Sequence, residues 1–419
     1  MKKKGILYML VVVFFLLALC SITVLADTIK IGAFFPLSGS IADTGNRCKW
    51  AAETAMEIIN NSYPDLDLPL AASEGLPNLD GKKIEIIFSD HRGKADVGKA
   101  EAERLITQQN VVGLLGGYNS GVTKSASIIA EKYGIPLVNG SSSSTDLHKQ
   151  GFKTFFRVYS YDDLEMKSIF DGINEMNEKL GAGIKTYAVA YMVGEYGQNM
   201  LKWSKHYGDL YGYEMVEESG HPFGATDVSS AILRLKNANP DVIIHASLLS
   251  DYMLFLRGYK EANFFPKGIF SPCSGYQDLK LVERMGKDAD YIFGTQIFKL
   301  DRVEDNKNLK IVDGVYKKIS NGKGLDGVVM GELEATLVLA DAINRAGSVE
   351  SNKIIKALKE TDIQWDIDVG GGVKFTEEGQ NERASVIISQ IVGGEYKTVL
   401  PLDKATTDLI WPTPAWNQR

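Results

Sequence analysis

Two groups of serines stand where a protein could hold an anion. Ser120 follows the apolar stretch 111–117 and begins a predicted helix, and residues 141–144, all serines, follow the apolar stretch 135–140. The first N–H groups of a helix have no partner within it, and serine hydroxyls donate hydrogen bonds without adding charge. Because ligands bind at the carboxyl ends of neighbouring parallel strands, both groups are expected to share one site. Together they predict a cradle for a carboxylate, although each group alone is also typical of an N-cap or a flexible loop.

Motifs for covalent catalysis, nucleotides and metals are missing from the sequence. The stretch "GYNSG" at 117–121 places its serine one position too late for the nucleophile elbow of hydrolases. Neither a phosphate-binding loop nor a dinucleotide fingerprint occurs, and the five histidines lack metal-ligand spacing. No cofactor and no metal are therefore expected. His245, at the end of an apolar stretch, is expected to be a hydrogen-bonded core residue, with a role in a pocket as the alternative.

The composition is that of a globular protein that does not bind nucleic acid. The 419 residues are 44% hydrophobic and 24% charged, with a net charge of −7. A single core rarely exceeds roughly 250–300 residues, so two domains are expected. An acidic chain is a poor partner for nucleic acid. Cys48 and Cys273 lie far apart, and the sequence does not say whether they meet.

The first 26 residues have the features of a signal peptide. Three lysines at 2–4 precede an apolar run that ends in "VLA" at 24–26. Cleavage after Ala26 would export the protein to the periplasm or another extracytoplasmic compartment. Two alternatives stay open. The run is long enough for an uncleaved membrane anchor, and Cys20 lies in a stretch similar to a lipoprotein box, although Leu19 departs from it.

Strands and helices alternate along the rest of the chain. Short apolar strands without strict alternation are typical of parallel sheets that helices cover on both faces. A second series of the same kind begins near residue 185, and antiparallel strands are expected near the C-terminus around a "GGEY" turn at 393–396. The fold class predicted is α/β, with two doubly wound lobes. In the first series, strands are expected at 29–35, 83–90, 111–117 and 135–140, with helices at 45–60, 96–109 and 120–133.

Several stretches resemble the periplasmic solute-binding proteins of ABC importers, in particular the type I group that binds leucine, isoleucine and valine. The resemblance covers nearly all of the chain after residue 26. It implies two lobes joined by three crossings, residues 27–160 plus 298–385 and residues 161–297 plus 386–419. It also implies closure around a ligand, a monomer, delivery to a membrane permease and no enzymatic activity. The stretches that carry it are "IGAFFPLSGSIADTG", "GLLGGYNSGVTKSASIIAEKYGIPLVNGSSSSTDL", "FRVYSYDDLE", "GEYGQNM" and "WPTPAW".

The same resemblance implies a ligand site between the lobes. The ligand carboxylate would be held by Ser120, Ser143 and the backbone of Ser141. Tyr196 would reach the ligand from the second lobe. The loop after the first strand would line the cleft near two further residues, Ser38 and Thr44.

The residues expected to bind a ligand ammonium depart from the family pattern. Cys273 stands where branched-chain amino-acid binders have an acid, Leu248 replaces a tyrosine, and Thr44 replaces an aromatic residue. A neutral thiol is a poor partner for a cation, and an unpaired buried charge is very costly. The preferred ligand is therefore expected to have a carboxylate and an apolar or aromatic body, without an ammonium at that position. The alternative is an amino acid whose ammonium is bound by Asp251, Asp162 or backbone carbonyls.

Two other functions are alternatives to that of a transport binding protein. A sensory receptor module would use the same kind of cleft, but no apolar span follows the signal peptide. A serine hydrolase would need a nucleophile elbow, which the sequence lacks.

Overall fold

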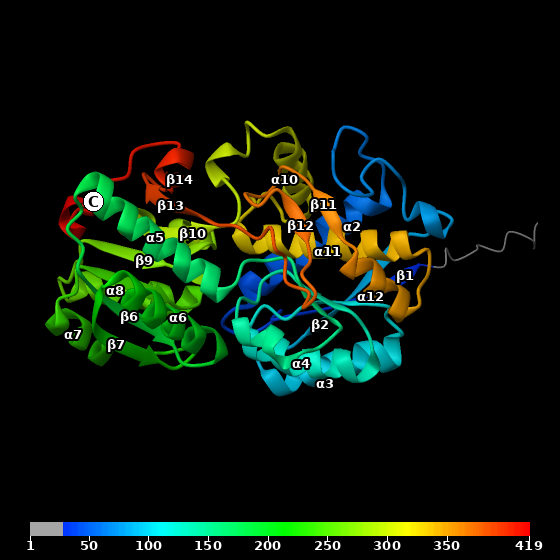
Figure 1. The fold of residues 1–419 in the computed structure, drawn as a ribbon, viewed down its shortest axis with the longest axis horizontal. Helices are drawn as coiled ribbons and strands as arrows, with labels where there is room; N and C mark the ends of the chain where they lie inside the picture. Colours follow the sequence, from blue (N-terminus) through cyan, green and yellow to red (C-terminus); the bar gives the residue numbers. More distant parts are fainter. Residues whose placement is uncertain (1–27) are drawn as a thin grey trace, which may run out of the picture.

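The computed structural model describes residues 28–419, which form two α/β lobes side by side (Figure 1). The signal-peptide prediction and Cys20 lie outside these residues. The first lobe contains β1 to β5 with helices α2 to α4 and α10 to α12. The second lobe contains helices α5 to α9 with β6 to β10, β13 and β14. In Figure 1 the yellow to orange helices return to the blue and cyan lobe, whereas the red strands complete the green lobe.

The first lobe is built on a parallel sheet with the order β2-β1-β3-β4-β5. This is a doubly wound order, which confirms the predicted fold class, and its switch point lies between β1 and β3. Helices α3 and α4 pack together on one face, and α2 packs against α11 on the other. The strands are Ile29–Phe35, Ile84–Asp90, Leu114–Gly116, Leu137–Asn139 and Phe155–Arg157. The helices are α2 Ala42–Asn60, α3 Ala95–Gln109, α4 Ser120–Tyr133, α10 Lys307–Ile319, α11 Gly327–Ala346 and α12 Ser351–Lys359.

The second lobe is built on a seven-stranded sheet with the order β14-β13-β10-β9-β8-β6-β7. The strands β6 to β10 pair in parallel, and β13 is antiparallel to both of its neighbours, as expected for the C-terminal strands. The turn is shorter than "GGEY", because β14 already begins at Glu395. The strands are β6 Thr186–Met192, β7 Glu214–His221, β8 Val242–Ala246, β9 Gly268–Ser271, β10 Phe293–Gln296, β13 Ile387–Val392 and β14 Glu395–Leu400. The helices are α5 Asp162–Leu180, α6 Glu195–Tyr211, α7 Ser229–Ala238, α8 Leu249–Glu261 and α9 Lys280–Met285.

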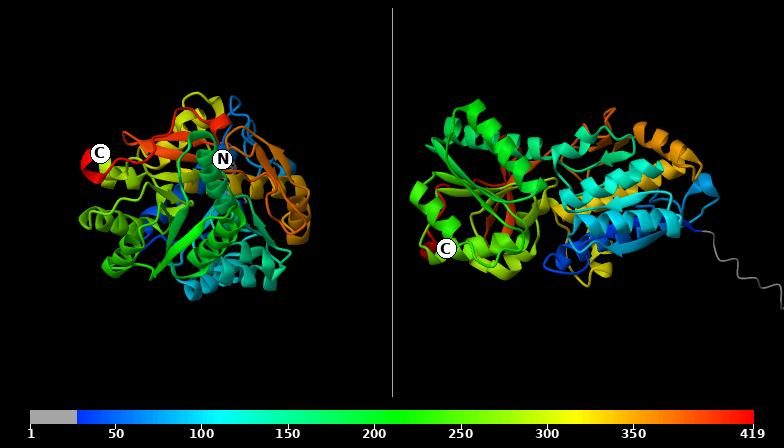
Figure 2. Two further views of the ribbon diagram at one scale, coloured as in Figure 1. Left: turned by 60° about the vertical axis from the view of Figure 1, so that its left-hand side comes forward. Right: turned by 90° about the horizontal axis from the view of Figure 1, so that it is seen from below.

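Three segments of the chain connect the lobes (Figure 2). The first joins β5 to α5, the second follows β10, and the third leads from the small β11–β12 hairpin (Asp362–Gln364 and Gly372–Lys374) to β13. The connections are tied to one another. The Asn381 backbone N–H donates to the Arg157 carbonyl at 2.9 Å, and the Val369 N–H donates to the Ile297 carbonyl at 2.8 Å. The three crossings therefore form one connected hinge region.

Residues 61–80 form the expected long connection, which carries apolar side chains into the core. Leu66, Leu68, Ala71 and Leu76 are all buried. Elsewhere, Cys48 and Cys273 are both buried free cysteines. Among residues 28–419, no helix is long and apolar enough to cross a membrane.

Candidate functional site

A cavity of about 160 Å³ lies between the lobes, at the carboxyl ends of strands from both sheets. Its walls come from the segments that follow β2, β3 and β4 in the first lobe and β6, β7, β8 and β9 in the second. This is the edge at which doubly wound sheets bind ligands. Five of the eight predicted site residues line the cavity: Ser120, Ser141, Ser143, Tyr196 and Leu248.

The turn between β3 and α4 depends on two glycines. Gly116 and Gly117 have φ values of 104° and 107°, a backbone region that favours glycine. A Cβ atom at Gly117 would overlap the Thr123 side chain. The sharp turn places Ser120 at the start of α4 and directly in the cavity wall.

The serine run after β4 is a braced loop, unlike the flexible linker that its composition also allows. Ser141 and Ser143 line the cavity, whereas Ser142 and Ser144 do not. The Ser142 hydroxyl lies 2.6 Å from the Thr123 hydroxyl. The Arg157 guanidinium donates to the carbonyls of Ser142 and Ser144 at 3.1 and 2.8 Å. The bracing fixes the two cavity-lining serines in place.

Four backbone N–H groups around these serines donate no hydrogen bond within residues 28–419. They belong to Ser120, Gly121, Ser141 and Ser143. The Ser120 hydroxyl oxygen accepts the Ser144 N–H at 3.4 Å, which leaves the hydroxyl hydrogen available. Unpaired N–H groups at a helix start and in an adjoining loop form a site that favours an anion.

The second-lobe wall carries no acid at the position of Cys273. The Tyr196 hydroxyl donates to the Pro272 carbonyl at 3.1 Å, and the Cys273 sulfur lies 3.8 Å from the same hydroxyl. Cys273 is not among the lining residues, although its neighbour Ser274 is. Burial, together with the charges of Glu165 and Asp162, raises the pKa of the Cys273 thiol well above its usual value. The thiol is therefore neutral.

Ser38 and Thr44 do not line the cavity. The Ser38 hydroxyl is exposed and donates to the Asp90 carboxylate at 2.5 Å. The buried Thr44 hydroxyl donates to Asp278 of the second lobe at 3.1 Å. Thr44 thus contributes to the contact between the lobes.

The two alternative acids differ in their surroundings, and neither lines the cavity. Asp251 is buried and accepts the Gly224 N–H at 3.1 Å. Asp162 lies beside the Ser143 hydroxyl and the Arg157 guanidinium, which favour its ionised form, but neither carboxylate oxygen makes a hydrogen bond of normal geometry. The effect of burial on the pKa of Asp162 is larger than that of these two neighbours, and it raises the pKa to about 8.

His245 is a core residue, but the prediction that it is hydrogen-bonded is wrong. Its ring packs against the rings of Tyr252 and Phe255 at centroid distances of 4.6 and 4.7 Å. Neither ring nitrogen has a hydrogen-bond partner among the described residues. The end of β8 faces the aromatic side of α8. Burial there lowers the pKa of the His245 imidazole, so the ring is neutral.

A serine, a histidine and an aspartate lie together behind the second-lobe wall. The Ser247 hydroxyl is 2.7 Å from His221 Nε2, and His221 Nδ1 is 3.9 Å from the Asp251 carboxylate. Ser247 is fully buried and does not line the cavity, so this set presents no nucleophile there. Asp251 of α8 instead braces the loop after β7, because it accepts the N–H of Gly224 in that loop. That loop carries Phe223 into the cavity wall.

Phe223 and Glu195 are site residues that the sequence analysis missed. Phe223 is 39% exposed and faces Gly93 of the first lobe, where a Cβ atom would lie 3.7 Å from the ring. No motif marks Phe223, because a loop of unpredicted shape places it. Glu195 lies within the "GEYGQNM" stretch, beside the predicted Tyr196.

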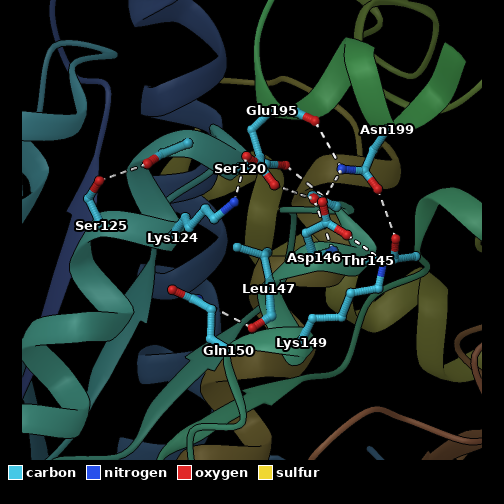
Figure 3. A network of polar contacts seen from close by, with 12 residues as sticks. Ser120, Lys124, Ser125, Thr145, Asp146, Leu147, Lys149, Gln150, Glu195 and Asn199 are labelled. Carbon is cyan, nitrogen blue, oxygen red and sulfur yellow. Dashed lines mark hydrogen bonds and ion pairs between the residues drawn. The ribbon is translucent and has the colours of Figure 1, made fainter. Parts of the chain in front are cut away.

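Polar contacts hold the two lobes together beside the cavity (Figure 3). Glu195 of α6 accepts hydrogen bonds from Lys124 at 2.9 Å and from the Ser144 hydroxyl at 3.0 Å. One turn further along α6, the Asn199 side chain accepts the Thr145 hydroxyl at 2.8 Å. Both lobes thus supply the polar contacts beside the cavity.

Two α/β lobes, three connections and a cavity between the lobes define a two-lobed ligand-binding protein. The chain belongs to the periplasmic binding protein family, whose profile matches residues 28–395. It is 27% identical over 396 residues to the Leu/Ile/Val-binding protein homolog 7 of Brucella abortus, covering 92% of this chain and 94% of that protein. This family consists of extracytoplasmic solute-binding proteins.

Two solved structures share the fold. The branched-chain amino acid substrate-binding protein of Streptococcus pneumoniae, in complex with isoleucine, has a TM-score of 0.74 and 22% identity, covering 92% of this chain and all of that chain. A solute-binding protein of Rhodopseudomonas palustris, in complex with 3,4-dihydroxybenzoic acid, has a TM-score of 0.73 and 19% identity, covering 94% of this chain and all of that chain. These likenesses confirm the type I periplasmic binding protein fold that the sequence predicted.

No metal site was expected from the sequence. Among residues 28–419, no group of three or more histidine, cysteine, aspartate or glutamate side chains is placed to hold a metal ion.

Proposed function

We propose that this protein is the solute-binding component of an ABC importer and that it binds a small carboxylate-bearing solute in the interlobe cavity. The observation that carries the proposal is the set of four unpaired N–H groups at Ser120, Gly121, Ser141 and Ser143. A carboxylate would accept these N–H groups and the Ser120 hydroxyl together. Such charge-assisted hydrogen bonds are stronger than neutral ones.

The apolar part of the cavity supports a ligand with an apolar or aromatic body. Val122 of the first lobe and Met192, Phe223 and Leu248 of the second line the wall away from the serines. Isoleucine and 3,4-dihydroxybenzoic acid, which the two structural neighbours bind, are both carboxylic acids, and only isoleucine has an ammonium. Both amino acids and other organic acids are therefore candidates.

In this proposal the protein works as an exported monomer that hands its ligand to a membrane permease. The first lobe would comprise residues 27–160 plus 298–385, and the second residues 161–297 plus 386–419. Closure of the lobes about the hinge would trap the ligand between them, and opening at the permease would release it. Signal peptide cleavage near Ala26 would free the protein from the membrane.

A ligand panel tests the proposal. Thermal unfolding is measured with amino acids, aliphatic acids, aromatic acids, keto acids and amides. A ligand that binds only the folded protein adds about 2.7 kcal/mol of stability at a hundredfold excess over Kd. We expect selected acids to raise the melting temperature and the corresponding amides to leave it unchanged. Stabilisation by amides as strong as that by acids would contradict the carboxylate cradle.

A further inference from the structure

Phe223 lies on an exposed loop that follows an edge strand of the second lobe. Strand β7 is the last strand of the seven-stranded sheet, and most residues of the loop 222–226 are exposed. Phe223 and Gly224 form a turn, in which Gly224 has a φ of 70°. An exposed turn at the edge of a sheet has few packing contacts of its own. Other groups must therefore determine where the Phe223 ring lies.

Two buried side chains hold the backbone on both sides of Phe223. His221 Nδ1 lies 2.9 Å from the Pro222 carbonyl oxygen, directly before Phe223. The Asp251 carboxylate accepts the Gly224 N–H, directly after Phe223, at 3.1 Å. The side chains of His221 and Asp251 are both buried and lie 3.9 Å apart. Phe223 is thus placed between two peptide groups that are anchored to the interior of the lobe.

The surroundings of His221 orient its ring for this contact. Burial lowers the pKa of the imidazole, so the ring is neutral and carries one hydrogen. Because the Pro222 carbonyl oxygen only accepts hydrogen bonds, this hydrogen lies on Nδ1, and Nε2 accepts from the Ser247 hydroxyl at 2.7 Å. The ring also packs against the Phe255 ring, with 5.0 Å between the centroids. The end of β8 and helix α8 therefore direct the N–H group that holds the loop.

The Phe223 side chain extends from this loop to the first lobe. It lines the cavity and faces Gly93, where a Cβ atom would lie 3.7 Å from the ring. Because the ring is only partly buried, its place in the wall depends on its backbone anchors. A wall residue that is ordered before the ligand arrives contributes more to affinity, since binding then does not have to order it.

We infer that His221 and Asp251 are positioning residues that hold Phe223 in the cavity wall and thereby determine how well ligands with large apolar bodies bind. This inference rests on the proposed function and names residues that set its selectivity. Neither residue lines the cavity, so both act through the loop and not on the ligand. The buried serine, histidine and aspartate set thus has a role in selectivity, and Asp251 has a role other than binding an ammonium.

Two pairs of variants separate the hydrogen bonds from the packing. His221→Asn places an amide N–H near the position of Nδ1 and can still donate to the Pro222 carbonyl, whereas His221→Gln places its amide near Nε2 and loses this donor. Asp251→Asn keeps an oxygen that accepts the Gly224 N–H, whereas Asp251→Leu removes it at similar volume. We call His221→Gln and Asp251→Leu the loss variants and the two asparagine substitutions the rescue variants.

The first measurement needs no ligand. The protein is labelled with 4-fluorophenylalanine, and Phe223→Leu identifies the fluorine signal of Phe223. The unaltered protein and the rescue variants should give one signal, shifted from the position of a solvent-exposed ring. The loss variants should move this signal toward the exposed position. The control Asp227→Ala removes the acceptor of the Ser229 N–H at the end of the same segment and should leave the signal in place.

The second measurement is calorimetry with two pairs of ligands, 3-phenylpropanoate with propanoate and phenylalanine with alanine. The loss variants should weaken binding of the larger ligand of a pair by about 2- to 10-fold, the effect of one hydrogen bond, and leave the smaller within about twofold. The rescue variants and Asp227→Ala should bind as the unaltered protein does. In a Phe223→Ala background the loss variants should have no further effect, because they act only through that side chain.

The outcomes separate this inference from the proposed function. An unmoved Phe223 signal in the loss variants would overturn the inference, and one folded loss variant suffices for this test. Equal weakening of both ligands of a pair, or a further loss in the Phe223→Ala background, would overturn it as well and leave the carboxylate cradle standing. Failure of the unaltered protein to bind any acid of the wider panel would reject the proposed function and the role in selectivity, whereas the fluorine signal would still report whether His221 and Asp251 hold Phe223.

Discussion

Lys124 of α4 and Glu195 of α6 form an ion pair between the lobes, with 2.9 Å between the Lys124 Nζ and the Glu195 carboxylate. The first residue of α4, Ser120, lines the cavity, and Glu195 itself lies in the opposite wall. The pair therefore connects the two walls of the cavity. Because its lysine side chain is 39% exposed, its contribution to closure is modest and depends on salt.

Removing this ion pair should weaken ligand binding slightly. Lys124→Met is expected to raise Kd by about two- to fivefold at low salt and to have no effect at about 1 M salt. The control is Lys132→Met in the same helix, whose lysine pairs with Glu103 inside the first lobe. Calorimetry at two salt concentrations measures the effect. An equal change in the control would show that the effect does not arise between the lobes.

The cradle serines should dominate affinity. Ser120→Ala and Ser143→Ala are each expected to weaken binding of the best acid by about 10- to 150-fold, because hydrogen bonds to a charged group are lost. The folding free energy should change little. Ser125→Ala is the matched control, since this serine lies in the same helix outside the cavity and donates to the Gly121 carbonyl. Unchanged affinity in both cradle variants would contradict the proposed carboxylate position.

Phe223 should select for the size of the ligand body. Phe223→Ala removes an aromatic wall and is expected to weaken binding of acids with large apolar bodies by about 5- to 30-fold. Acids as small as propanoate should be affected far less. Phe265→Ala serves as the control, because Phe265 is similarly exposed, at 44%, and lies outside the cavity lining. An equal loss for small and large ligands would argue that Phe223 acts on closure and not on the ligand body.

Buried acids near the hinge should make stability fall as the pH rises. Burial raises the pKa of Glu165 to about 7 and that of Asp162 to about 8. A raised folded-state pKa means that the folded protein keeps protons which the unfolded chain has lost. The stability present below the unfolded pKa values is therefore lost as the pH rises toward 7 to 8.

Urea unfolding between pH 5 and pH 8 measures this effect. Glu165→Gln should reduce the fall in the free energy of unfolding over this range by up to roughly 3 kcal/mol. This is the free energy that corresponds to a pKa shift of about 2.5. The fully buried Ser160 hydroxyl, which donates to Glu165, can still donate to the glutamine oxygen. A pH profile identical to that of the unaltered protein would contradict the buried proton at Glu165.

Much of the fold and the serines of the cradle could be predicted from local sequence. Ser120 begins α4 as predicted, because a short apolar strand, a glycine turn and an N-terminal serine act within a few residues. Helix α5 was not predicted, although Met166, Ile169, Phe170 and Ile173 are buried at helical spacing. These are local signals, and local signals suffice for secondary structure.

The parts that could not be predicted depend on contacts between distant segments. Glu332 reaches Ser141 across 191 residues of chain, through a backbone contact that only the packed fold creates. Ser38 and Thr44 were assigned to the cleft by resemblance, yet each donates its hydroxyl to an aspartate outside the cavity lining. Side-chain direction at such positions depends on which acid lies nearby, and the sequence does not carry that information.

The most direct test of the central claim is a crystal structure of the protein bound to the tightest acid from the ligand panel. The account predicts one ligand between the lobes, with its carboxylate oxygens within hydrogen-bond distance of the N–H groups of Ser120, Gly121, Ser141 and Ser143. Its apolar body should contact Phe223. A carboxylate bound elsewhere in the cavity, or a ligand bound outside it, would contradict the account.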